Sequence, residues 1–189
     1  MTRRLLALVL GLCLLALAGG CGNSARVAVA PTRVPVSLVP AELGAGGIRL
    51  YPKTDKKTVA AFANASDETL QADARLWELR QGDRLVGALQ VTTVVPKLDL
   101  ADATDRRSLL KQILPGVLSR LDVGDQPVWA TVSNDKVVYM WFGRGLFEVL
   151  QLKGSQLEPE RVLTDIVTFQ TSSKTWVGLP ASAYDEKQP

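Results

Sequence analysis

The sequence has no histidine and only two cysteines, Cys13 and Cys21, among its 189 residues. A chain without histidine cannot form a Ser-His-Asp triad or the histidine ligand sets of most catalytic zinc sites. Two cysteines are too few for a disulfide scaffold or a cysteine-rich metal centre. The phosphate-binding pattern GxGxxG and the nucleophile pattern GxSxG do not occur either. We therefore expect a non-enzymatic protein that uses no metal and no cofactor.

The first 20 residues have the layout of an export signal. Arg3 and Arg4 precede an apolar run over residues 5–17, and the small residues 18–20 lead directly to Cys21. A transmembrane helix needs about 20 apolar residues, which is more than this run supplies. The segment predicts a signal peptide over the first 20 residues, with an uncleaved signal anchor as the alternative.

The residues Ala18-Gly19-Gly20-Cys21 resemble the lipobox of bacterial lipoproteins. The resemblance implies cleavage before Cys21, acylation of this cysteine, and attachment of the mature chain to the extracytoplasmic face of the cell membrane. Cys13 lies inside the apolar run and would be removed with the signal peptide. The membrane, reached through the lipid on Cys21, is thus the first expected partner.

The charge of the chain gives no indication of a nucleic-acid partner. The net charge of +3 includes Arg3 and Arg4, which a signal peptidase would remove. The remaining chain would hold 20 basic residues against 19 acidic residues. A nearly neutral chain lacks the basic surplus of nucleic-acid-binding domains, so we expect no nucleic-acid partner.

Composition divides the mature chain into three parts. Prolines interrupt residues 21–40 before any helix could form, which predicts a lipid-anchored flexible tether. Val34–Val39, which is rich in β-branched residues, could alternatively join a sheet as an edge strand. Residues 41–170 are long enough for a single globular domain, and residues 171–189 form a polar C-terminal tail.

Hydrophobic periodicity in the domain predicts both strands and helices. Alternation at period two predicts a strand over residues 48–51, and β-rich runs between turn sequences predict strands over residues 70–79, 84–95, 127–132, 137–142 and 146–153. Apolar stripes at helical spacing predict helices over residues 54–65, 103–114 and 159–169. The fold class is therefore α+β, with an antiparallel sheet made of a hairpin and a three-stranded meander, covered by two or three helices. This element order is loosely similar to that of PsbP-like domains of exported bacterial lipoproteins, a family that implies binding or assembly rather than catalysis.

The helix predicted over residues 103–114 has an acidic start and an amphipathic body. Asp99, Asp102 and Asp105 lack the spacing of a calcium loop, and the helix dipole, which favours acidic residues at a helix start, explains them better. Asp102 or Thr104 is expected to cap the helix. Arg106 is expected on the outer, solvated face of the helix.

The strand predicted over residues 137–142 carries large apolar side chains on both faces. With a three-residue turn at residues 143–145, Phe147 would lie across from Trp141 and share its face with Tyr139. These three aromatic residues are the candidate lining of an apolar cleft, with Arg144 at its rim able to pair with an acidic head group. The alternative is that the aromatic side chains are ordinary core.

The sequence thus predicts a membrane-anchored, extracytoplasmic lipoprotein with a non-enzymatic binding domain. Its ligand would be an apolar envelope molecule, such as a lipid or glycolipid, or a protein partner. The alternative function is a cell-envelope hydrolase that uses a catalytic pair without histidine, such as Ser/Lys or two carboxylates.

Overall fold

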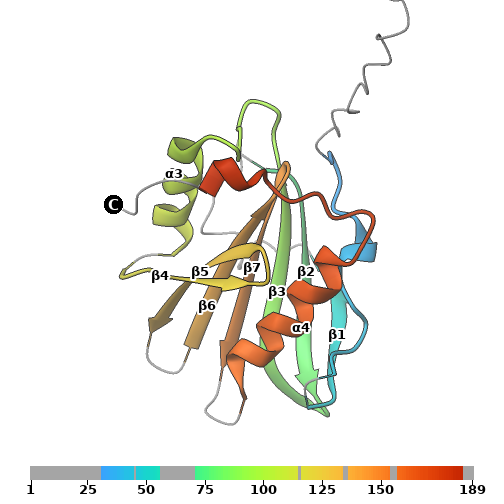
Figure 1. Cartoon of the computed structure of the whole chain (residues 1–189). Helices are drawn as coiled ribbons and strands as arrows, with labels where there is room; N and C mark the ends of the chain where they lie inside the picture. The colour runs from blue at the N-terminus through green and yellow to red at the C-terminus, as the bar shows by residue number, and fades with distance from the viewer. Residues whose placement is uncertain are drawn as a thin grey trace, which may run out of the picture.

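A seven-stranded antiparallel sheet forms the centre of the protein, with strands in the order β1-β2-β3-β7-β6-β5-β4 (Figure 1). The computed structural model describes residues 31–44, 46–55, 71–114, 116–133, 136–153 and 157–184. The strands are β1 Ile48–Lys53, β2 Gln71–Gln81, β3 Arg84–Val94, β4 Ser119–Val123, β5 Gln126–Ser133, β6 Lys136–Gly143 and β7 Leu146–Lys153. The described helices are α3 Ala103–Ile113 and α4 Pro159–Thr171, with the short 3₁₀ helices η1 Val36–Leu38 and η3 Ala181–Tyr184. The predicted α+β class with an antiparallel sheet is confirmed.

The two faces of the sheet are covered by different helices. Side chains of α3, including Leu109 and Leu110, pack with Met140 of β6 in one apolar cluster. Side chains of α4, including Leu163 and Ile166, pack in a second cluster on the opposite face. We call these the α3 face and the α4 face. The sheet therefore has a core on each side, which explains why β6 is apolar on both faces.

The chain reaches the far edge of the sheet before it returns to the centre. After β3 it crosses the sheet through α3 to β4, and the meander β4-β5-β6-β7 then runs back until β7 pairs with β3.

The strand β4 was not predicted. Leu121 and Val123 alternate there with polar residues, and Gly124 at φ 59° makes the following turn, but a run of five residues is a weak signal.

The segment predicted as a tether packs on the sheet from Val34 onwards. Val34 and Leu38 are buried, and the Val34 backbone N–H donates to Asp73 Oδ2 at 2.9 Å. The alternative of an edge strand over Val34–Val39 is wrong, because Val36–Leu38 forms the helical turn η1. The predicted signal peptide, Cys21, residues 22–30 and the predicted helix from residue 56 onwards lie outside the described residues.

The residues after α4 also lie against the domain as far as Tyr184. Residues 172–180, which we call the strap, cross the end of the sheet, and Gly178 forms a β-bridge with Gly143. In η3, the Tyr184 hydroxyl donates to the Phe142 carbonyl oxygen at 3.2 Å. The part of the predicted polar tail that the structure describes is therefore packed on the sheet.

Arg106 is buried under the packed tail, so its predicted position on the solvated face of the helix is wrong. Asp102 caps α3 as predicted, and the backbone N–H of Thr104 lowers the pKa of its carboxyl. Arg106, expected in solvent, is only 3% exposed because η3 covers it. Its guanidinium donates to the carbonyl oxygens of Leu100 at 2.7 Å and of Ala183.

Candidate functional site

The hairpin between β6 and β7 decides which aromatic residues share a face. Its loop has two residues, Arg144 and Gly145, because Gly143 pairs with Leu146. The predicted three-residue turn is therefore wrong by one position. As a result Phe147 lies opposite Phe142 on the α3 face, and Trp141 lies opposite Glu148 on the α4 face.

The three predicted cleft residues belong to the two cores. Tyr139 and Trp141 are in the cluster under α4, whereas Phe147 is in the cluster under α3. All three are at most 4% exposed. The predicted pairing of Trp129 with Met140 is confirmed, and Trp129 meets the Phe142 ring edge-on at 5.3 Å between centroids. Tyr139, Trp141 and Phe147 therefore do not line a common cleft.

A buried polar network occupies the α4 face where the cleft was expected. The Trp141 indole Nε1–H donates to Gln170 Oε1 at 3.0 Å, and Gln170 Nε2 donates to Glu148 Oε2 at 2.6 Å. None of the three side chains is exposed to solvent. Among the described residues, Glu148 Oε1 has no hydrogen-bond partner. Gln170 thus joins the end of α4 to two neighbouring strands.

The buried carboxyl of Glu148 has a raised pKa, which favours its protonated form. Burial raises its pKa from 4.5 to about 8, and the hydrogen bond from Gln170 opposes this rise only in part. Glu148 was missed because glutamate in a strand is ordinarily taken as solvent-facing. The available signal was its position on the same face of the strand as Leu146, Leu150 and Leu152.

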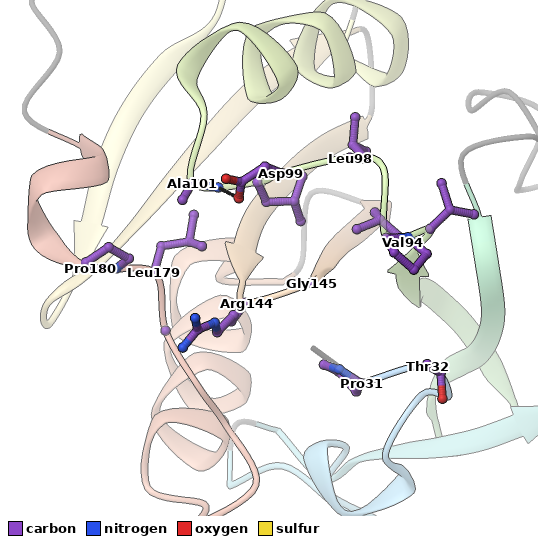
Figure 2. A pocket seen from close by; sticks show the side chains of 14 residues that line it. Pro31, Thr32, Val94, Leu98, Asp99, Ala101, Arg144, Gly145, Leu179 and Pro180 are labelled. Carbon is purple, nitrogen blue, oxygen red and sulfur yellow. Dashed lines mark hydrogen bonds between the residues drawn. The ribbon is translucent and has the colours of Figure 1, made fainter. Parts of the chain in front are cut away.

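A pocket of about 720 Å³ opens at the end of the sheet where β6 turns into β7 (Figure 2). Four separate segments line it: residues 31–32, residues 94–101, the turn 144–145 and the strap residues 178–180. Most of the lining is apolar, including the side chains of Pro31, Val94, Leu98, Leu100, Leu179 and Pro180. Figure 2 shows Pro31 and Thr32 across the pocket from Leu179.

Arg144 is the predicted site residue that the structure places at this pocket. Its side chain is exposed, and no salt bridge reaches it in the part of the chain that the structure describes. Its backbone is fixed, because the Arg144 N–H donates to the Val177 carbonyl oxygen at 2.7 Å. The turn is also held from the other side, where Val94 N–H donates to Gly145 O at 3.0 Å. A turn whose backbone is hydrogen-bonded on both sides therefore presents an exposed guanidinium at an apolar pocket.

Asp99 supplies the carboxylate of the pocket lining. Its Oδ1 accepts the Ala101 backbone N–H at 2.9 Å, which fixes the loop before α3. Its own backbone N–H donates to Asp105 Oδ2 at 2.9 Å. These contacts give Asp99 a role in shaping the loop, in line with the predicted structural role of the three aspartates.

Comparisons with models of known protein families, with curated proteins and with solved structures returned no match. Within the described residues, no group of acidic or cysteine side chains is placed to hold a metal ion. No described helix has the length and apolar character needed to cross a membrane.

Proposed function

We propose that this protein is a lipoprotein, anchored through acylated Cys21 to the extracytoplasmic face of the cell membrane, whose domain binds a ligand without catalysis. The observation that carries the binding role is the pocket beside Arg144. It combines apolar walls with a cation that lacks a salt bridge among the described residues. Its volume lies within the range of about 300 to 1,000 Å³ that is usual for small-molecule sites.

The composition of the pocket favours binding over hydrolysis. A hydrolase with a carboxylate pair needs two acidic groups facing one another, and the described lining includes the single carboxylate of Asp99. The buried Glu148 lies elsewhere, under α4. No observation favours the hydrolase, and we put forward no second function.

The anchor is tested with the full chain and a matched pair of cysteine variants. Cells that produce the wild type, Cys21→Ser or Cys13→Ser are fed an alkyne-tagged fatty acid, and the extracted protein is analysed by intact mass spectrometry. We expect the wild type and Cys13→Ser to lack residues 1–20 and to carry the tag, and Cys21→Ser to carry none. An untagged wild type that retains residues 1–20 would support the uncleaved signal anchor instead.

The binding role is tested on the same extract by native mass spectrometry in mild detergent. We expect a bound small molecule or a stoichiometric protein, whose amount falls when the pocket is blocked by Ala101→Trp. Ala101 lines the pocket and its side chain is exposed, so this change leaves the core intact. Equal amounts of bound molecule in the two proteins would place the binding surface away from this pocket.

A further inference from the structure

We propose that the pocket binds an anionic lipid of the membrane that holds the anchor, with one acyl chain against the apolar wall and the acidic head group at Arg144. This inference rests on the proposed function, because it needs the domain to be held near a bilayer. It names the chemical class of the ligand, which the proposed function leaves open.

The first argument is the position of the pocket relative to the anchor. Pro31 and Thr32 line the pocket, so the chain that comes from Cys21 meets the domain at this site. Pro31 lies ten positions after Cys21, and at about 3.5 Å per position a chain of this length spans at most about 35 Å. The tether therefore keeps this wall of the pocket within about 35 Å of the lipidated residue.

The second argument is the distribution of polarity around the pocket. The loop 94–101 and the strap residues Leu179 and Pro180 supply apolar surface for an acyl chain. Arg144 supplies a guanidinium, which binds phosphate through paired N–H donors. In the described residues no carboxylate forms a salt bridge with it. The carboxylate of the lining, Asp99, accepts the Ala101 backbone N–H at 2.9 Å and forms no salt bridge with Arg144 among the described residues. The guanidinium beside the apolar wall therefore matches an amphiphile with an anionic head.

The third argument is the size of the pocket. A volume of about 720 Å³ suits a ligand of drug-like size, which corresponds to a head group and one chain rather than to a whole two-chain phospholipid. The lipid would therefore keep part of its apolar surface in the bilayer. Binding at the membrane surface removes the need to extract the lipid completely.

The experiment uses the full lipidated chain reconstituted in phosphatidylcholine vesicles. The vesicles contain a minor amount of phosphatidylglycerol with a photoreactive group on one acyl chain, or phosphatidylcholine with the same photoreactive chain. After irradiation, crosslinked peptides are located by mass spectrometry. We expect crosslinks from phosphatidylglycerol in residues 94–101 and 178–180, and few from phosphatidylcholine.

Two variants and a matched control make the result specific. Arg144→Gln should reduce crosslinking by about tenfold, because it removes the charge-assisted contact with the head group. Ala101→Trp should reduce it as well. Arg161→Gln removes an exposed arginine at the start of α4, and crosslinking should stay at the wild-type level. Circular dichroism checks that each variant is folded.

Four results would overturn the proposal. Equal crosslinking by both lipids, or crosslinking that Arg144→Gln leaves unchanged, would exclude recognition of an anionic head. Crosslinks absent from the pocket would exclude a lipid there. Crosslinks that appear only when Cys21→Ser is mixed with the vesicles would identify the chain's own acyl groups as the occupant. Because the mass of the same sample reports whether Cys21 is acylated, failure of the anchor and failure of lipid binding are distinguishable.

Discussion

Replacing Glu148 with glutamine should stabilise the protein at neutral pH and remove part of its pH dependence. The folded protein holds this carboxyl at a pKa of about 8, compared with 4.5 for an exposed glutamate. Because the folded pKa is raised, the contribution of Glu148 to stability is greatest below pH 4.5 and is lost as the pH rises towards 8. About pH 7 lies some 2.5 pH units above 4.5, and each pH unit corresponds to about 1.4 kcal/mol. The free energy of unfolding at this pH is therefore lower by about 3 kcal/mol than below pH 4.5.

Glutamine can replace the protonated carboxyl without losing its hydrogen bond. Gln170 Nε2 donates to Glu148 Oε2 at 2.6 Å, and a glutamine carbonyl can accept the same bond. The amide N–H₂ would take the place of Oε1, which has no partner among the described residues. We therefore expect Glu148→Gln and the wild type to have similar free energies of unfolding at low pH.

The assay is urea unfolding of both proteins at several values between about pH 5 and about pH 8. We expect the stability of the wild type to fall by about 3 kcal/mol more than that of Glu148→Gln over this range. Glu160→Gln removes an exposed glutamate from the same side of the molecule, and its pH profile should follow the wild type. If Glu148→Gln and the wild type lose stability in parallel, Glu148 does not titrate in the folded state as we infer.

Three further changes test the packing around the pocket. Arg106→Met leaves buried carbonyl oxygens without their donor, and urea unfolding should show a loss of about 3 kcal/mol; a loss near zero would mean that solvent reaches these oxygens. Asp102→Ala removes the cap of α3 and should lower the free energy of unfolding; an unchanged value would show that the cap is dispensable. Gly143→Ala places a Cβ at 2.9 Å from the Trp176 ring, and thermal melting should show a loss of about 1 to 3 kcal/mol. Gly178→Ala, whose Cβ would meet Trp176 at 3.7 Å, should melt close to the wild type, and equal losses in the two variants would contradict the clash.

The sheet could be predicted where turn chemistry is unambiguous. Residues Gln81-Gly82-Asp83 predict a hairpin loop, and β2 and β3 pair on either side of it as expected, with the turn itself reduced to Gly82 and Asp83 because Gln81 pairs with Arg84. The sequence 143–145 contains two glycines, so both a two-residue and a three-residue loop fit it. The structure adopts the shorter loop, with Gly145 at φ 70°. A slip of one residue exchanges the faces of a strand, which is why Phe147 was misplaced and Glu148 was missed.

The pocket could not be predicted from local patterns. Its walls come from four segments, and the first and the last of them are about 150 positions apart in the sequence. Arg144 could be proposed as a binding residue from the sequence, because it is a charged residue between two glycines directly after an apolar strand. Arg106 was misplaced for a related reason, since helical periodicity cannot show that η3 later covers its face.

The pairing of β3 with β7 has a consequence for how the protein folds. Gly87 pairs with Leu152, 65 positions later in the chain, so the two halves of the sheet join only when almost all of the domain is available. Until then the hairpin of β2 and β3 has an unpaired edge with apolar residues such as Leu89 and Val91. Sequence-distant pairing slows folding and leaves edges open to other chains. A partly synthesised or truncated chain should therefore aggregate, and it should depend on chaperones until β7 closes the sheet.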